Sequence, residues 1–152
     1  AAAAGVDVVH HGMGISLRLQ QEWCMFLSSR GVADPKLSLR SREGNMPLLQ
    51  FDRCVFRLQP VASDKGAITR KSDGTMRHGP VVYGRPVHIV HSYSGLYVTI
   101  IRKPAETDPT HFKVALMTLE DAGSACRFRI LPRYKIRGEG DAVHNTDVVY
   151  IQ

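Results

Sequence analysis

An internal repeat runs through this sequence of 152 residues. The stretch CRFRILP at residues 126–132 matches CVFRLQP at residues 54–60, an offset of 72 positions (126 − 54 = 72). At the same offset, GRPVHIV at 84–90 lies over GMGISLR at 12–18, and in both stretches a glycine precedes apolar residues in alternate positions. Alternation with a period of two is typical of β-strands. The repeat therefore predicts a fold built from similar groups of short strands.

Two repeats of about four strands each favour an all-β fold with internal pseudo-symmetry. Propeller blades have a period of roughly 40–45 residues, which is shorter than the spacing seen here. A β-trefoil uses three such units, and GEGDAVHNTDVVYIQ at 138–152 restarts the pattern with glycines followed by an apolar strand. We therefore expect a β-trefoil whose third repeat is truncated, with a further copy of the closing strand after residue 152.

The repeat also predicts how the chain is divided. Residues 1–11 are expected to be a low-complexity or unassigned extension, and residues 12–152 a single trefoil-type domain. Within that domain we expect repeat one at 12–60, a loop at 61–78, repeat two at 79–132 and the start of repeat three at 133–152. The segment ITRKSDGTMRHGP is expected to be a mobile loop and EDAGSA a turn, and a short helix is expected in part of either ITRKSDGTMRHGP or RLQQEWCMFLSS.

Composition and charge narrow the classes of partner. The net charge is +6 and the sequence pI is about 9.5, but lysine and arginine occur one or two at a time rather than in a run. That spread argues against nucleic-acid binding. No apolar run approaches the roughly 18 residues that span a bilayer, so no membrane insertion by this segment is expected. The AAAAG start lacks the features of a signal peptide, and three cysteines without a C-x-x-C pair favour reduced thiols.

The residues that usually carry chemistry do not form a recognisable site. Histidines 88 and 91 would lie on opposite faces of a strand, and no cysteine and histidine set has zinc-ligand spacing, so no metal site is expected. Cys54 and Cys126 are either a redox pair or two equivalent core positions, and the tendency of cysteine to be buried favours the core. No nucleophile motif, phosphate loop or paired carboxylates occur. We expect no catalytic residue, no cofactor and no enzyme activity.

The best candidate for a binding site is the basic stretch RYKIR. Arg133, Tyr134, Lys135 and Arg137 place an aromatic ring among cations. One interpretation is a solvated loop in which Tyr134 packs against the barrel. The other is an interface with an adjacent domain or subunit, because arginine and aromatic residues are common at interfaces.

Two stretches carry a resemblance to a known family. YGRPVHIVHSYSGLYVT at 83–99 resembles the MIR-type repeat. VALMTLEDAGSACRFRILPRYKIRGEGDAVHNTDVVYI at 114–151 is similar to the N-terminal, suppressor-like β-trefoil of the inositol trisphosphate and ryanodine receptors, and FDRCVFRLQP at 51–60 resembles the strand that closes its first repeat. The sequence departs from the family pattern at Thr146, where the family has a glycine, and in a shorter loop after Gly31.

The resemblance implies a non-catalytic regulatory module of an intracellular calcium-release channel. Its partners would be neighbouring domains of the same chain and adjacent subunits of a homotetramer, at the cytosolic face of the endoplasmic reticulum membrane. In that family the basic cluster that binds inositol trisphosphate lies in later domains, so no ligand-binding residue is carried over. The alternatives are a MIR-type trefoil that binds glycans and a structural trefoil within a larger assembly.

Overall fold

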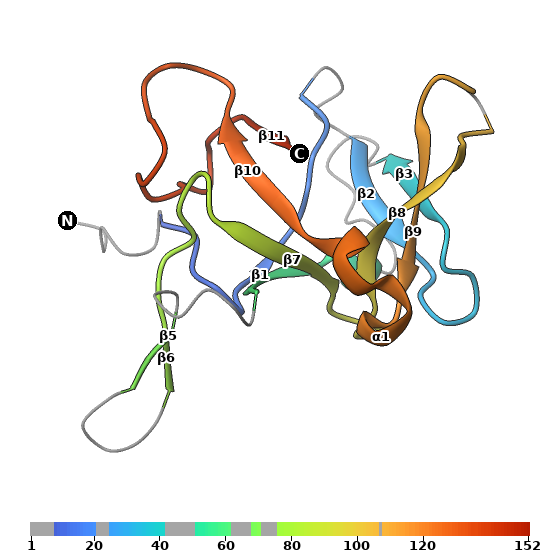
Figure 1. Ribbon diagram of the computed structural model, residues 1–152, viewed down its shortest axis with the longest axis horizontal. Coiled ribbons are helices and arrows are strands. Elements are labelled where there is room, and N and C mark those ends of the chain that lie inside the picture. The colour runs from blue at the N-terminus through green and yellow to red at the C-terminus, as the bar shows by residue number, and fades with distance from the viewer. Residues whose placement is uncertain (1–7, 21–24, 42–50, 62–67, 71–75, 107) are drawn as a thin grey trace. The chain divides into compact units, whose positions relative to one another are not determined.

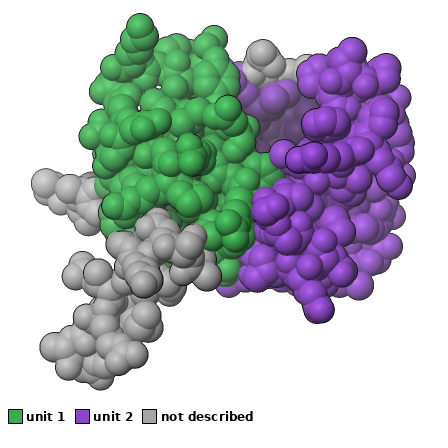
Figure 2. Space-filling view, in the orientation of Figure 1, with its two compact units in different colours: residues 1–13, 58–88, 127–152 green, residues 14–57, 89–126 purple. Residues whose placement is uncertain are grey.

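The computed structural model of the chain describes residues 8–20, 25–41, 51–61, 68–70, 76–106 and 108–152 (Figure 1). The chain divides into two compact units that interleave in sequence (Figure 2). Unit 1 comprises residues 1–13, 58–88 and 127–152, and unit 2 comprises residues 14–57 and 89–126. Each unit is described below by itself.

The described part of the chain is dominated by antiparallel β-strands, which confirms the predicted all-β class. The strands are β1 (Gly14–Ile15), β2 (Met25–Ser29), β3 (Leu37–Ser41), β4 (Phe56–Pro60), β5 (Ile68–Arg70), β6 (Met76–His78), β7 (Pro86–His91), β8 (Tyr97–Pro104), β9 (Phe112–Met117), β10 (Phe128–Pro132) and β11 (Val149–Ile151). The helical elements are the one-turn helix α1 (Leu119–Ala122) and the 3₁₀ helices η2 (Phe51–Cys54) and η3 (Gly123–Cys126).

The two repeat segments adopt the same local structure. Each begins with a 3₁₀ helix that ends at a fully buried cysteine, Cys54 in η2 and Cys126 in η3. A five-residue strand follows, and its phenylalanine, Phe56 in β4 or Phe128 in β10, is buried. The partner strands match as well. Phe56 pairs with Ile15 in β1, and Phe128 pairs with Val87 in β7, so that both members of the second pair lie 72 positions after those of the first.

The glycine that precedes the first strand of each repeat is equivalent too. Gly12 and Gly84 have φ values of 82° and 89°, a region that residues with a Cβ atom rarely adopt. The N–H of Gly12 donates to the carbonyl of Leu58 at 2.9 Å, and the N–H of Gly84 donates to the carbonyl of Ile130 at 3.1 Å. Each glycine thus turns the chain so that it meets the closing strand of its own repeat.

A closed ring of three backbone hydrogen bonds lies in unit 1. Val9 N–H donates to the carbonyl of Val143, Val143 N–H donates to the carbonyl of Val81, and Val81 N–H donates to the carbonyl of Val9, each at 2.8 Å. All three valines are buried. Three equivalent backbones that bond in a circle are what a threefold arrangement of repeats would produce. The ring supports the trefoil interpretation, which stays a prediction, as do the domain bounds.

Burial explains why the repeats keep their apolar pattern. Four consecutive residues of β7, 87–90, are almost completely buried, so this strand is covered on both faces rather than on one. His88 and His91 therefore lie in the interior. Among the described residues, neither belongs to a group of three side chains that could hold a metal ion. Burying a large apolar side chain stabilises a fold by about 1.5–3 kcal/mol, so the pattern is maintained by packing.

The structure differs from the local expectations at three places. The EDAGSA stretch is not a simple turn but forms the end of α1 and most of η3. Thr118 caps α1 by accepting a bond from the N–H of Asp121, and Gly123 with a φ of 57° ends the helix. Residues 25–29, the end of RLQQEWCMFLSS, form the strand β2, which pairs with β3 along five residues, and residues 21–24 lie outside the described part. The segment expected as a loop contains the paired strands β5 and β6, and residues 71–75 lie outside the described part.

Candidate functional site

The predicted interface stretch begins directly after β10, in unit 1. Arg133, Tyr134 and Lys135 are exposed, and Ile136 is the most exposed large apolar side chain in the described part of the chain, at 86%. Tyr134 is 53% exposed, so its ring is not packed into the interior. Arg137 differs from the others because its side chain is only one-third exposed. The structure therefore separates the four predicted residues into an outward group and one inward anchor.

Arg133 is held by two aromatic rings. Its guanidinium carbon lies 5.2 Å from the ring centre of Tyr150 in β11 and 5.8 Å from that of Tyr134. Its Nη1 atom also donates a hydrogen bond to the hydroxyl of Tyr150. Cation–π contacts of this kind contribute roughly 0.5–1 kcal/mol each at exposed sites. Arg133 and both tyrosines thus form one ordered, solvent-facing cluster.

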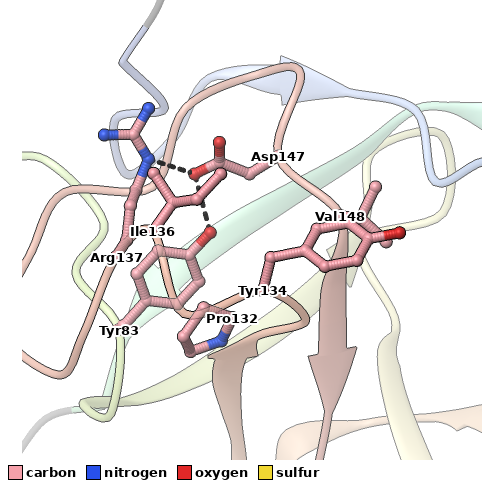
Figure 3. A pocket seen from close by; sticks show the side chains of 7 residues that line it. All are labelled: Tyr83, Pro132, Tyr134, Ile136, Arg137, Asp147 and Val148. Carbon is pink, nitrogen blue, oxygen red and sulfur yellow. Dashed lines mark hydrogen bonds and ion pairs between the residues drawn. The ribbon is translucent and has the colours of Figure 1, made fainter.

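The inward anchor is a hydrogen-bonded cluster around Asp147 (Figure 3). A single oxygen, Oδ2, accepts three bonds: from the hydroxyl of Tyr83 at 2.7 Å, from Nε of Arg137 at 2.9 Å and from the backbone N–H of His144 at 3.0 Å. Figure 3 shows Tyr83 and Arg137 converging on Asp147, whereas the hydroxyl of Tyr134 points away from it. The cluster ties the end of the predicted stretch to the residues that precede β7 and β11.

The charges in this cluster follow from its hydrogen bonds. Burial by itself would raise the pKa of Asp147, but the bonds from His144, Tyr83 and Arg137 outweigh it and hold that pKa below its usual range. The pKa of Tyr83 is raised well above its ordinary value, first by burial and then by its bond to the Asp147 carboxylate. At neutral pH the pair is therefore a carboxylate bound by a protonated tyrosine.

A small cavity of about 90 Å³ adjoins the cluster. Its lining residues are Tyr83, Pro132, Tyr134, Ile136, Arg137, Asp147 and Val148. Small-molecule sites usually measure about 300–1,000 Å³, so this cavity is too small for a metabolite. It has room for one or two side-chain atoms of a partner or for a few water molecules.

Unit 2 contains a second buried polar cluster, centred on His91. Its Nε2 lies 2.8 Å from the carbonyl oxygen of Arg53, and its Nδ1 lies 2.8 Å from Oγ of Ser94. Because a carbonyl can only accept, the neutral ring carries its proton on Nε2 and Nδ1 accepts from the serine hydroxyl. The ring of His91 also packs against Phe56, with centroids 5.2 Å apart. This cluster joins η2 to the turn between β7 and β8.

An open hollow of about 530 Å³ lies beside that turn in unit 2. It is lined by Arg30, Val32, Ala33, Arg53, Tyr93 and Ser94. Val32 is 77% exposed, and the guanidinium of Arg53 lies 5.8 Å from the ring centre of Tyr93. No motif of the sequence predicted this hollow. An apolar residue beside a turn glycine, as in GVADP, was the available signal.

The candidates for metal and redox chemistry have structural roles. Cys54 and Cys126 are both free and fully buried, as the core interpretation predicts, and the thiol of Cys126 lies 3.4 Å from the carbonyl of Gly123. Cys24 lies outside the described residues. In the described part of the chain, no three histidine, cysteine or acidic side chains are grouped so that they could hold a metal ion. The same residues include no helix long and apolar enough to cross a membrane.

Sequence reasoning identified the exposed half of the site and missed the half that holds it in place. Tyr83 and Asp147 were noted as parts of the repeat pattern, but not as partners, because 64 positions separate them. An acid inside an otherwise apolar strand start, as in NTDVVYI, was the available signal.

Comparison with protein families gives one match across almost the whole chain. A family model described as inositol 1,4,5-trisphosphate/ryanodine receptor matches residues 5–152. This match confirms the resemblance to the inositol trisphosphate and ryanodine receptors drawn from residues 51–60 and 114–151.

Proposed function

Because the chain belongs to the inositol 1,4,5-trisphosphate/ryanodine receptor family, we propose that it is a non-catalytic regulatory module that acts through contacts with other domains and subunits. The observation that carries this proposal is the division of the RYKIR stretch. Arg137 is fixed by Asp147, while Tyr134 and Ile136 are presented to solvent. Large exposed apolar side chains on an anchored backbone are typical of an interface, because little order has to be gained on binding.

Regulation by such a module requires different contacts in two states of the receptor. A partner that contacts Tyr134 and Ile136 in only one state would shift the equilibrium toward that state. Coupling energies of this kind are typically about 1–3 kcal/mol, which corresponds to 5–150-fold in affinity. Loss of a single exposed aromatic contact is of the right size to change that coupling measurably.

The wider setting follows from the same proposal. The module works at the cytosolic face of the endoplasmic reticulum, as part of a homotetrameric calcium channel. Its partners are neighbouring domains of its own chain and adjacent subunits. The small cavity next to Asp147 could not accommodate inositol trisphosphate, so the RYKIR stretch is proposed to act on channel ligands indirectly.

The test is to replace Tyr134 with alanine in a receptor assembly that contains this chain. We expect the affinity for the channel ligand to change by at least about fivefold, the lower end of typical coupling. Phe112→Ala is the matched control, because Phe112 is an aromatic side chain of similar exposure in unit 2. A Tyr134→Phe variant separates the ring from the hydroxyl. Unchanged ligand affinity in a folded Tyr134→Ala receptor would refute this assignment of the contact.

A further inference from the structure

We propose that the outer face of β10 and β11 docks an acidic, carboxylate-rich segment of a protein partner. We call this surface the arginine face; it comprises Arg127, Arg129 and Arg133 with Leu131 and Tyr150. The inference rests on the proposed function, because the RYKIR stretch forms one end of the surface, and it adds the chemical class of the partner.

Strand alternation places the arginines on one side. Phe128 and Ile130 of β10 are buried, whereas Arg127 and Arg129, which alternate with them, are exposed. On a strand, residues two apart point to the same face. The arginines at positions 127, 129 and 133 therefore lie in one strip on the same exposed side of unit 1, along β10 and at its two ends.

The pairing of β10 with β11 extends this strip sideways (Figure 1). Leu131 lies directly opposite Tyr150, and Arg129 exchanges two backbone hydrogen bonds with Gln152, each 2.9 Å long. Residues directly opposite each other in an antiparallel pair share a face, so Tyr150 and Leu131 lie between Arg129 and Arg133. The strip thus combines cations with an apolar and aromatic middle.

The charge on the arginine face is not balanced within the described part of the chain. There, no carboxylate forms an ion pair with Arg127, Arg129 or Arg133, and neither β10 nor β11 contains an acidic residue. Tyr134 and Tyr150 hold the guanidinium of Arg133 in place. A guanidinium matches a carboxylate with two parallel hydrogen bonds, and an ordered one loses less entropy when it binds.

The first repeat shows that the fold does not require this charge. At the offset of 72, the counterparts of Arg127 and Arg133 are Val55 and Val61, and Val61 is buried. β4 has the same length and the same buried phenylalanine as β10. Arginine at 127 and 133 is therefore a property of the second repeat and not of the strand, which is what a binding surface would need.

An acidic protein segment fits the arginine face better than a nucleic acid does. A phosphate backbone carries a charge at every nucleotide, whereas the arginine face has the uncharged Leu131 and Tyr150 between its arginines. A short acidic segment could instead place its carboxylates on the arginines and its apolar side chains on Leu131 and Tyr150.

The test is direct binding of a labelled peptide to the full chain. The probe is a fluorescein-labelled peptide of glutamate with interspersed leucine, and the control peptide replaces every glutamate with glutamine. In fluorescence anisotropy at about 50 mM salt, where surface charges are weakly screened, we expect the glutamate peptide to bind at least about tenfold more tightly than the control.

Matched charge reversals locate the binding. The double variant Arg129→Glu with Arg133→Glu is expected to bind the glutamate peptide about tenfold or more less tightly. Arg102→Glu with Lys103→Glu makes the same charge change at exposed residues of β8 in unit 2, and should weaken it by less than about twofold. Circular dichroism melting checks that both variants fold. Tyr150→Ala, in which Arg133 loses one of its two rings, is expected to have an intermediate effect.

Several results would overturn the proposal. Equal binding of the glutamine peptide would exclude carboxylate recognition, and equal weakening by the β8 reversal would exclude the arginine face. Tighter binding of an oligothymidylate of equal charge, or of phosphatidylserine vesicles, would assign the surface to a nucleic acid or to a membrane. If the peptide binds as expected but Tyr134→Ala leaves the receptor unchanged, the docking surface stands and the proposed regulatory contact fails. The reverse result leaves the regulatory contact and removes the acidic partner.

Discussion

The strands β4 and β10 have matching backbones and different outer faces. Both follow a 3₁₀ helix that ends in a buried cysteine, and both bury a phenylalanine. At the alternate positions, Arg57 of β4 is half-buried, with Val55 before it and the buried Val61 after it. In β10 the equivalent Arg129 is exposed, and Arg127 and Arg133 stand where the first repeat has the two valines. The inner positions are set by packing and are kept. The outer positions vary, and they are where the two repeats differ in what they can bind.

The largest effect is expected in the shared interior. Phe56→Ala and Phe128→Ala should each lower the free energy of unfolding by about 3–5 kcal/mol, because each removes a buried aromatic ring and leaves a cavity. Phe56 is fully buried and Phe128 is 6% exposed, so we expect the loss at Phe56 to be at least as large. Urea unfolding measures both. A loss below about 1 kcal/mol at either position would mean that the repeats do not share one mode of packing.

The next effect concerns the hydrogen bond between Tyr83 and Asp147. The counterpart of Tyr83 at the offset of 72 is His11, whose Nδ1 lies 3.0 Å from the carbonyl of Gly79. Tyr83→Phe leaves the partly buried Asp147 short of one hydrogen bond and should cost about 1–3 kcal/mol. His11→Ala is the comparison variant in the first repeat, and a Tyr83→Phe protein that unfolds in urea like the unchanged protein would contradict this prediction.

The pH dependence has a defined sign. The folded-state pKa of Asp147 lies below its unfolded value, so its contribution to stability is present above the ordinary value of about 3.9 and is lost as the pH falls through the folded pKa. Asp147→Asn should flatten this acid limb. The pKa of Tyr83 is raised, so its contribution is present below about 10 and is lost as the pH rises further. Tyr83→Phe should flatten that alkaline limb, and unfolding curves across pH measure both limbs.

The paired glycines give a smaller effect. Gly12→Ala should cost about 1–2 kcal/mol, because a residue with a Cβ atom is strained at its positive φ. Gly84→Ala should cost more, since its new Cβ would lie 3.1 Å from Cγ of Glu139, whereas nothing lies within 4 Å at Gly12. Glu139→Ala should remove the difference. If Gly12→Ala is the more harmful change in denaturant unfolding, the two turns are not equivalent.

The smallest effect is expected at the matched arginines. Arg129→Ala should change stability by no more than about 0.5 kcal/mol, because the side chain is exposed. Arg57→Ala should have the larger effect, since its half-buried stem packs against neighbours. Its buried Nε has no hydrogen-bond partner in the described part of the chain, so Arg57→Met should retain most of the stability. Equal losses of stability in Arg57→Ala and Arg129→Ala would contradict the proposed difference between the outward-facing residues of β4 and β10.

The alternating pattern of the repeat predicted which side chains are buried and which are exposed, because alternation depends only on neighbouring residues of one strand. Burial of Phe56 and Phe128 and exposure of Arg129 follow from alternation alone. Partners that are distant in sequence were not predictable, and the bonds of Asp147 to Tyr83 and of His91 to the Arg53 carbonyl are examples. The local sequence does not determine which residues at the beginnings of different strands will contact each other.

Short elements were also missed, for a different reason. The helix α1 depends on Thr118 and Gly123, which lie outside the four helical residues, so the acidic stretch between them looked like a turn. Apart from Phe26, the strand β2 contains residues that are not enriched in strands, and its structure is determined by five paired positions on β3. In both cases context outside the segment decides the conformation.

The ring formed by Val9, Val81 and Val143 has a consequence for how the chain folds. It joins positions 72, 62 and 134 residues apart (81 − 9, 143 − 81 and 143 − 9), so all of residues 9 to 143 must be present before it closes. Contacts between such distant positions slow folding, because the entropy of loop closure is lost before the contact forms. On the ribosome, the backbone groups of Val9 and Val81 that face Val143 must wait until synthesis has passed that residue. The hydrogen-bonded ring of unit 1 thus combines a residue made early, Val9, with one made 134 residues later, Val143.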